Sequence, residues 1–264
     1  MTAPAFALVH GAAEEVRPSP SYRFDNSRRS TEHNCLVVQL TLAGQGFIRG
    51  PEGEHRVPAD HAMLFTHREP TIYGYPPGER ASYRLRFVSM SPAPELEAMF
   101  IRLRADFGRV VRVPRGSLPA SLFAEAYGKA RDHAFTDRFE EAELLYRLLL
   151  ALYREQVQGS RASDPIGFGY HLLRDRFRQP LNLKDITEAC AISREHFTRG
   201  FHARYGETPS TMLRRLRLEH GRRLLLTTEL PVEDVAVASG FASSHSFGRA
   251  YRQAHGHPPS TERR

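Results

Sequence analysis

The segment VEDVAVASGFASSHSFGRAYRQAHGHPPS, which spans Val232–Ser260, decides the fold of the second half of the chain. Its apolar first part ends at Gly240, a residue that can adopt the positive φ of a tight turn without strain. Ser243 follows, and its hydroxyl can accept a backbone N–H at the start of a second helix. In that helix Phe247 and Tyr251 are four residues apart, so they share one face. The segment therefore predicts a helix-turn-helix unit with a buried aromatic face.

The chain contains a second copy of this unit, LKDITEACAISREHFTRGFHARYGETPS, which begins at Leu183. With one residue inserted, the copies match in these pairs: Ile186 with Val235, Thr187 with Ala236, Ala191 with Gly240, Ser193 with Ser243, Phe197 with Phe247, Arg199 with Arg249, Phe201 with Tyr251 and Pro209 with Pro259. Ala191 can adopt the positive φ expected of Gly240 only at a cost. The repeat predicts two helix-turn-helix units of the same design.

A long helix is expected to connect the two copies. Thr208 is a natural N-cap, and Pro209 suits the first helical turn. If this helix is rigid, it fixes the separation of the two units. A separation of about 34–36 Å would place them in successive major-groove segments of B-DNA.

The second helix of each copy carries small polar and arginine side chains opposite its aromatic residues. Serine and threonine hold a helix less well than Glu, Lys and Gln, so an ordinary solvated surface would not favour them. A lone arginine on a helix is most often solvated, but Arg199 and Arg249 occupy the same position in two copies. Equivalent placement in a basic region favours contact with DNA. His245 alone is a weaker indication, because a histidine in the first turn can cap a helix or face water.

Excess positive charge is confined to this part of the chain. The 264 residues carry a net charge of +7, and residues 165–264 hold 16 Arg and Lys against 10 Asp and Glu, which leaves +1 for the first 164. A polyanionic partner is therefore expected for the second half only. No apolar run is long enough to cross a bilayer and no signal-peptide pattern is present, so we expect no membrane partner and a cytoplasmic location. Cys35 and Cys190 lie in apolar settings, which favours buried thiols over a disulfide or a metal pair.

The first part of the chain has a different periodicity. From Phe6 to Val113, short extended runs alternate with Pro and Gly turns, which predicts a small antiparallel barrel or jelly roll. Within it, CLVVQLTLAGQGFIRG predicts a hairpin that turns at Gly44 and Gly46. From 118 to 158, apolar residues recur every three or four positions and predict two helices. The second helix is expected to be capped by Thr136 or Asp137 and to end at Gly159.

The second of these helices carries a wide leucine stripe: Leu144, Leu145, Leu148, Leu149, Leu150 and Leu152. The stripe can pack on its own barrel and on the partner helix near Phe123 and Tyr127, or it can form a subunit interface, and the two interpretations are compatible. The polar segment GSRASDP, Gly159–Pro165, is expected to be a linker. The predicted organisation is a sensor domain over 1–115, a helical dimerisation region over 116–158, a linker over 159–165 and a DNA-binding domain over 166–264.

Together these segments resemble the AraC/XylS family of transcriptional regulators. The resemblance is carried by the connecting helix LRRLRLEHGRRLLL and by Val232–Ser260, and it covers about a hundred residues from Pro165 closely. The stretch LTLAGQGFIRGPEGEHRVPADHAMLF is similar, less specifically, to the family's cupin-like sensor domain. The resemblance implies an α+β fold: an N-terminal cupin-like antiparallel β-barrel with helices, then an all-α domain of two helix-turn-helix units joined by a long helix. It implies a regulator without a cofactor rather than an enzyme, and an activator is expected although the residues do not distinguish activation from repression.

The resemblance also implies partners and contact residues. The expected partners are double-stranded DNA, a second copy of the chain and a small-molecule effector, and RNA polymerase is a further candidate. Base contacts would come from Glu195, Thr198 and Arg199 in the first copy and from Ser244, His245, Ser246 and Arg249 in the second, with Arg194 on phosphates. Arginine can donate two hydrogen bonds to guanine, and Ser, Thr or His can each serve one base-edge group. Gly200, Gly221 and Glu262 depart from the family pattern, and a glycine inside a helix costs about 0.5–1 kcal/mol relative to alanine.

The barrel region supports two further hypotheses. Strand alternation makes Gln39, Tyr73, Tyr83 and Arg86 candidates for a polar effector pocket, although each could equally point to solvent or serve the fold. The alternative function is a cupin-type metal-dependent enzyme with an accessory helical domain, because this region contains His33, His55, His61 and His67. A metal site needs a His-x-His or a facial His/His/carboxylate set. None of these histidines has that spacing, and Glu52, Glu54 and Glu69 lie in turn-like contexts, so no metal is expected.

Overall fold

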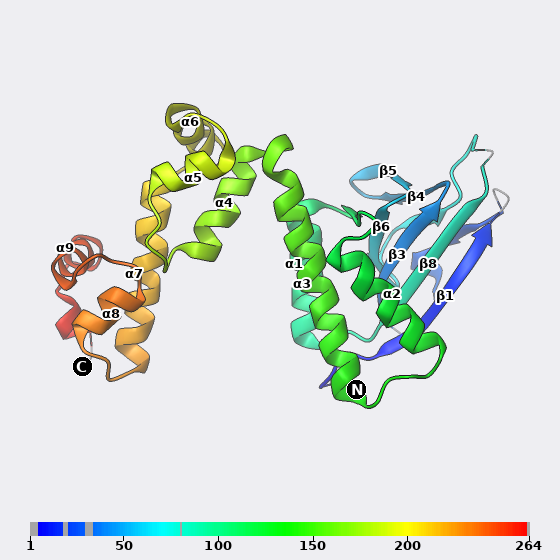
Figure 1. The fold of residues 1–264 in the computed structure, drawn as a ribbon, viewed down its shortest axis with the longest axis horizontal. Helices are drawn as coiled ribbons and strands as arrows, with labels where there is room; N and C mark the ends of the chain where they lie inside the picture. The colour runs from blue at the N-terminus through cyan, green and yellow to red at the C-terminus, as the bar shows by residue number, and fades with distance from the viewer. Residues whose placement is uncertain (1–4, 18–20, 30–33, 80, 263–264) are drawn as a thin grey trace. The chain divides into compact units, whose positions relative to one another are not determined.

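The computed structural model describes residues 5–17, 21–29, 34–79 and 81–262. Its contacts divide into two compact units, Met1–Gln156 and Val157–Arg264. In the described residues, the first unit combines two β-sheets with α-helices and the second is helical (Figure 1). The predicted α+β architecture, a β-rich part followed by a helical part, is confirmed. No helix in the described residues is long and apolar enough to cross a lipid bilayer.

Two antiparallel sheets form the β-rich part of the first unit. Their strand orders are β1-β8-β3-β6-β9 and β2-β7-β4-β5. The strands are β1 Val9–Arg17, β2 Arg23–Asp25, β3 Leu36–Ala43, β4 Gln45–Gly50, β5 Gly53–Pro58, β6 His61–Thr66, β7 Ile72–Gly74, β8 Tyr83–Met90 and β9 Val110–Arg112. Each pairing between these described strands is antiparallel, as the short runs and the absence of crossover helices predicted.

The hairpin predicted at Gly44 and Gly46 is wrong. β3 pairs with β6 and β8, whereas β4 pairs with β5 and β7, so the chain passes from one sheet to the other at Gly44. Gly44 has a φ of 70°, and a Cβ there would lie 2.4 Å from the carbonyl oxygen of Ser82. Glycine is therefore required by the close approach of two backbones, not by a two-residue turn.

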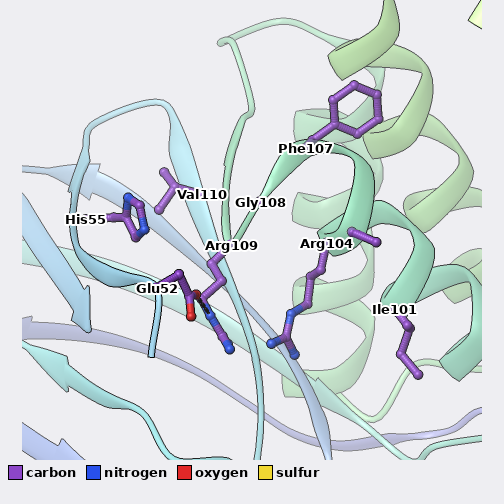
Figure 2. Close-up of a pocket in the computed structure, with 9 residues that line it drawn as sticks. Glu52, His55, Ile101, Arg104, Phe107, Gly108, Arg109 and Val110 are labelled. Atoms are coloured by element: carbon purple, nitrogen blue, oxygen red, sulfur yellow. Dashed lines mark hydrogen bonds and ion pairs between the residues drawn. The ribbon is translucent and has the colours of Figure 1, made fainter. Parts of the chain in front are cut away.

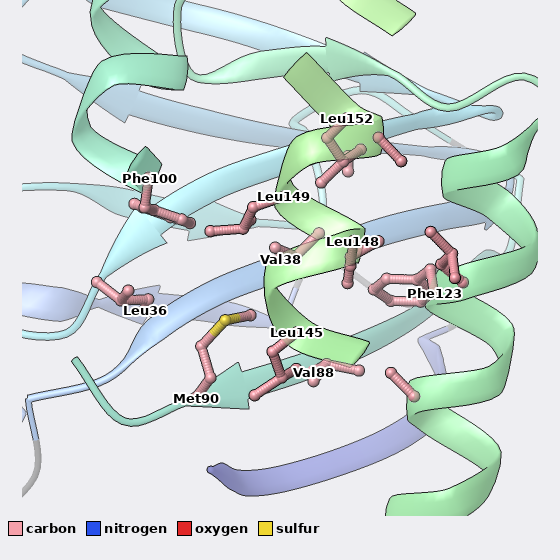
Figure 3. Close-up of a cluster of buried hydrophobic side chains, with 14 of the residues drawn as sticks. Leu36, Val38, Val88, Met90, Phe100, Phe123, Leu145, Leu148, Leu149 and Leu152 are labelled. Carbon is pink, nitrogen blue, oxygen red and sulfur yellow. The ribbon is translucent and has the colours of Figure 1, made fainter. Parts of the chain in front are cut away.

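Alternation along the strands produces two cores. Leu36 and Val38 of β3 face the helices α1 (Pro94–Phe107), α2 (Leu118–Arg131) and α3 (Arg138–Ser163), as Figure 3 shows. Val37 points the other way, into a cluster that includes residues of both sheets. Successive strand residues face opposite sides of a sheet, so one strand supplies both cores. The helix α1 lies within the region expected to be extended; Pro94 in its first turn and the buried Leu96, Phe100 and Leu103 account for it.

The leucine stripe of α3 packs inside its own unit. Leu145, Leu148, Leu149 and Leu152 lie against the sheet and Phe123 of α2 (Figure 3), and Leu144 is also buried. Leu150 alone of the six remains 51% exposed. The interpretation that this helix packs on its own barrel is therefore confirmed, and only Leu150 of the stripe is left for another surface.

The two ends of α3 differ in how well they were predicted. At the start, the Asp137 carboxylate accepts the backbone N–H groups of Phe139 and Glu140, both at 2.9 Å, so the predicted cap is present. At the other end, Gly159 does not stop the helix, which continues to Ser163 and leaves only Asp164 before α4. A single glycine weakens a helix by about 1 kcal/mol, too little to end one supported on both sides.

The second unit consists of two groups of three helices. They are α4 (Pro165–Arg176), α5 (Leu183–Cys190) and α6 (Arg194–Tyr205), then α7 (Pro209–Thr227), α8 (Val232–Ala238) and α9 (Ser244–His255). The hydroxyls of Ser193, Thr208 and Ser243 cap α6, α7 and α9 as predicted. Ala191 and Gly240 both have positive φ, 55° and 83°, so Ala191 bears the strain that its counterpart avoids.

A glycine in the first helix of each group allows the buried phenylalanine to approach closely. A Cβ on Gly169 of α4 would lie 2.3 Å from the ring of Phe197, and one on Gly221 of α7 would lie 2.8 Å from the ring of Phe247. Both rings are fully buried. Gly221 is therefore a packing requirement and not merely a weak point in the helix. The repeat thus extends to three helices per copy.

Arg217 of α7 joins the two groups. Its guanidinium donates hydrogen bonds to the carbonyl oxygens of Phe177 at 2.7 Å, Gln179 at 2.9 Å and Leu181 at 3.3 Å, all in the α4–α5 connection. The turn of the second copy lies against the same place, because a Cβ on Gly240 would be 2.6 Å from the Phe177 oxygen. Burial lowers the pKa of Arg217, but the side chain stays charged at any physiological pH.

Candidate nucleic-acid interface

The exposed face of α9 forms a shallow polar hollow. His245 and Arg249 lie on successive turns, and Arg252 continues the line toward the end of the helix. Gly248, between them, has open space where a side chain would be. The hollow is lined by His245, Gly248, Arg249, Arg252, Gln253, Pro258 and Pro259. A guanidinium and an imidazole beside a backbone that a ligand can approach closely suit hydrogen bonding to base edges.

The corresponding face of α6 has the same hollow. Its lining is Arg194, Glu195, Thr198, Arg199, His202 and Thr208. In the repeat, Glu195, Thr198 and Arg199 correspond to His245, Gly248 and Arg249, and His202 corresponds to Arg252. The structure therefore brings together all four residues predicted in the first copy, but only His245 and Arg249 of the four predicted in the second. Ser244 and Ser246 do not line the hollow of α9.

The two hollows differ in how their arginines are held. In the first copy, Arg199 donates to Glu195 at 3.1 Å, and both side chains are mostly exposed. Exposed pairs at this spacing are worth about 0.3–0.5 kcal/mol, so the pair orients Arg199 but does not prevent it from changing partner. In the second copy His245 replaces the glutamate, and no described carboxylate forms an ion pair with Arg249.

Ser246 has a structural role that the sequence did not indicate. Its hydroxyl donates to the carbonyl oxygen of Ser243 at 2.8 Å and accepts the Ser243 backbone N–H at 3.3 Å. The Ser243 hydroxyl in turn accepts the Ser246 N–H at 3.2 Å, which completes a capping box. Ser244 is exposed at the first position of the helix. Ser244, unlike Ser246, is not part of the capping box.

Three long polar side chains in the two linings were missed in the sequence: His202 in the first copy, and Arg252 and Gln253 in the second. The available signal was spacing, because His202 and Arg252 are three residues after Arg199 and Arg249 and so lie on the same helix face. Gln253 accepts a hydrogen bond from Arg214 of α7 at 3.4 Å, which ties the end of the second hollow to the connecting helix.

Of the four residues proposed for an effector pocket, the structure places three together and Arg86 elsewhere. Gln39 donates to the Tyr83 hydroxyl at 3.0 Å between the sheets, and burial raises the pKa of Tyr83 to about 12. Tyr73 lies in the same cluster, where its hydroxyl accepts from Arg29 at 2.5 Å. Arg86 is on the opposite face of β8: it stacks on Tyr127 of α2 at 4.1 Å and pairs with Glu14 of β1 at 2.5 Å. Its proposed place beside Gln39 and Tyr83 is therefore wrong.

The histidines proposed for the alternative metal site do not converge in the described residues. There, no group of three or more His, Cys, Asp or Glu side chains is placed to hold a metal ion. His55 is exposed on β5, and the Nδ1 of His61 donates to the carbonyl oxygen of Ala59, 3.1 Å away. His33 lies outside the described residues.

Two recognition helices mounted on buried aromatic residues define a protein with a double helix-turn-helix domain. A model described as a helix-turn-helix domain matches residues 186–264, and a model described as an AraC-like ligand binding domain matches residues 20–149. The chain belongs to the AraC/XylS family of transcriptional regulators.

Individual relatives match part of the chain. It is 36% identical over 84 residues to the HTH-type transcriptional regulator CdhR of Pseudomonas aeruginosa, which covers 32% of this chain and 25% of CdhR. The HTH-type transcriptional regulator GbdR of the same species is 32% identical over 92 residues, 35% of this chain and 25% of GbdR. The HTH-type transcriptional activator RhaS of Escherichia coli is 29% identical over 114 residues, 42% of this chain and 41% of RhaS. The matches thus span a quarter to two-fifths of the length of these relatives.

Solved structures also match part of the chain. The C-terminal domain of AraT, a response regulator from Geobacillus stearothermophilus, is 28% identical with a TM-score of 0.37 and covers 39% of this chain and 87% of that one. The DNA-binding domain of AdpA in complex with a target DNA is 25% identical with a TM-score of 0.36 and covers 38% of this chain and 90% of that one.

Proposed function

We propose that the chain is a sequence-specific DNA-binding transcriptional regulator. The observation that carries this proposal is the duplicated hollow: two equivalent polar surfaces, each with an arginine at the same position, in a region with six more basic than acidic residues. A solvated surface has no reason to repeat in this way, whereas two recognition helices on one duplex do. CdhR, GbdR and RhaS are named as regulators, which favours this function over the metal-dependent enzyme.

Each contact residue has a role that its chemistry supports. Arg199 and Arg249 would donate to guanine O6 and N7, and Glu195 would accept from the amino group of cytosine. Thr198, Ser244 and His245 would each serve one base-edge group. A separate set, Arg194, His202, Arg252 and Gln253, would contact phosphates and fix the register. Ser246 would act through the helix cap instead of touching a base.

The first unit would sense a small-molecule effector and pair two copies of the chain. The cluster that contains Gln39, Tyr73 and Tyr83 offers hydrogen-bonding groups between the sheets. We propose a sensor region at 1–115 and a dimerisation region at 116–158, with the exposed Leu150 as the contribution of α3 to an interface. The segment 159–165, predicted to be a linker, is instead mostly helical, because α3 continues to Ser163 and α4 begins at Pro165. Coupling between effector and DNA requires two states with different effector affinities.

The remaining partners follow from the proposed role. RhaS is named as an activator, and an activator would contact RNA polymerase in addition to DNA. A regulator of chromosomal DNA would act in the cytoplasm. No cofactor is needed for any of these steps.

Selection of bound sequences from a random duplex library would test the proposal with the full chain. We expect enrichment of a bipartite site, with the preference at one base pair of one half relaxed in Arg249→Ala and at one base pair of the other half relaxed in Arg199→Ala. Arg131→Ala serves as the control, because Arg131 pairs with Asp132 in the first unit. Absence of any sequence preference at moderate salt would refute the proposal.

A further inference from the structure

The first unit has a hollow at the junction of α1 with the sheets. This hollow is separate from the buried cluster that contains Gln39 and Tyr83. It has a volume of about 590 Å³ and is lined by Glu52, His55, Ile101, Arg104, Ala105, Phe107, Gly108, Arg109 and Val110. Figure 2 shows the two arginines approaching each other from α1 and from the start of β9, with Glu52 beside Arg109. None of these residues belongs to a proposed DNA or effector site.

Two guanidinium groups share one nearly buried carboxylate here. Arg104 pairs with Glu69 at 2.8 Å and Arg109 pairs with it at 2.5 Å, and the side chains are 17%, 13% and 11% exposed. The hydroxyls of Thr66 and Thr71 also donate to Glu69, at 3.1 and 3.2 Å. Glu69 is therefore saturated with donors, and it neutralises only one of the two arginine charges.

The remaining positive charge is paired with the carboxylate of Glu52, which can move away from Arg109. Glu52 accepts from the Arg109 Nε, but it lies on the tight turn between β4 and β5 and is 43% exposed. Gly50 makes room for it, since a Cβ at Gly50 would lie 2.8 Å from a Glu52 oxygen. Burial raises the pKa of Glu52, and hydrogen bonds from its own backbone and from Arg109 outweigh this and lower it. The pair with Glu52 thus shows that a carboxylate fits against Arg109. Because Glu52 is exposed, another carboxylate can displace it.

The wall beside the arginines is apolar. Ile101 of α1 is 55% exposed, and Phe107 and Val110 line the same hollow. An isolated exposed isoleucine needs no explanation, but one next to two arginines and an open hollow forms a surface with a cationic end and an apolar side.

We propose that this hollow binds a small carboxylate with a short apolar tail, whose carboxylate takes the place of Glu52 on Arg109 and also accepts from Arg104. The planar guanidinium groups match a carboxylate, and the tail would lie against Ile101. Glu52 would swing into solvent on its turn. This binding does not depend on the proposed regulatory function, because it involves no DNA and none of the residues of the recognition helices.

Calorimetric titration of the full chain with 3-methylbutanoate, in parallel with 3-methylbutanamide, would test the proposal. The two probes have the same shape and differ in charge. We expect the carboxylate to bind with about millimolar affinity or better and the amide to show no binding. Glu52→Gln removes the internal competitor and should tighten carboxylate binding about tenfold. Arg109→Gln and Arg104→Gln should each weaken it by about tenfold or more.

Arg115→Gln is the matched control, because Arg115 is an exposed arginine paired with Asp60 outside this hollow. It should leave binding unchanged. Equal binding of acid and amide, or carboxylate binding that survives both arginine substitutions, would overturn the proposal. If an arginine variant fails to fold, the Glu52→Gln titration decides: unchanged or weaker binding of the carboxylate would refute the displacement of Glu52.

Discussion

Adding one methyl group at Gly221 should destabilise the second unit, although helix propensity predicts the opposite. Alanine is favoured over glycine inside a helix by about 1 kcal/mol. The new Cβ, however, would lie 2.8 and 2.9 Å from two ring atoms of Phe247 and 3.1 Å from the Ser239 hydroxyl. The ring is fully buried and cannot move into solvent, so we expect an overpacking cost of about 1–3 kcal/mol. The net result should be a loss of up to about 2 kcal/mol.

Gly248→Ala is the matched control, because nothing lies within 4 Å of the position of its Cβ. It should therefore stabilise the same unit by up to about 1 kcal/mol. Native-state hydrogen exchange of the full chain, followed in peptides from α7 and α9, measures both effects in the unit concerned. A double-mutant cycle adds a further check: in a Phe247→Ala background the methyl at 221 should no longer be harmful, since the ring it meets is gone. Stabilisation by Gly221→Ala in the parent chain would refute the packing argument.

The remaining predictions concern binding, the core and acid stability. Arg249→Ala should weaken operator binding by about 1–3 kcal/mol and relax discrimination at one base pair, measured by competition with single-base variants of the selected site; a uniform loss over all sequences would assign Arg249 to a phosphate. Phe247→Ala should lower the free energy of unfolding of the second unit by about 3–5 kcal/mol in denaturant titration, and a parent-like transition would contradict the burial of this ring. Glu140 accepts from Lys129 at 2.5 Å and from the Thr136 N–H at 2.7 Å, and these contacts lower its pKa to about 2. A lowered pKa means that the contribution of Glu140 to stability is present at neutral pH and is lost as the pH falls from about 4.5 to about 2. Thermal melts across that range should be flatter for Glu140→Gln than for the parent chain, and equal slopes would show that another group carries the acid dependence.

The double helix-turn-helix domain could be predicted because its signals are local. Ser193 and Ser243 act on backbone groups within three residues, and Phe247 and Tyr251 face one side because of helix geometry alone. Because the unit is repeated, each of these sequence features occurs twice. The sequence of neither copy indicated which glycine packs against a buried ring. The contact of Gly221 with Phe247 joins two helices that are distant in sequence.

The errors in the first unit arise where the answer depends on neighbours in space. Periodicity marked β3 and β4 as strands, but it contained no information about which strand each would pair with, and they lie in different sheets. Arg86 is a different case. It is three residues from Tyr83 on one strand, and an odd spacing places two side chains on opposite faces. That separation was available from the sequence, whereas the convergence of Arg104 and Arg109 on Glu69 was not.

The position of Arg217 has a consequence for the architecture of an operator. One guanidinium on the helix that leads to the second copy holds three carbonyl groups of the first, so the two copies cannot swivel independently. Inserting one base pair between two half-sites rotates one of them by about 35° relative to the other. A hinged protein would follow that rotation at little cost. A protein whose two copies are held together in this way would lose the DNA contacts of one copy. The length of the spacer between the half-sites would then determine binding as much as the base sequence does.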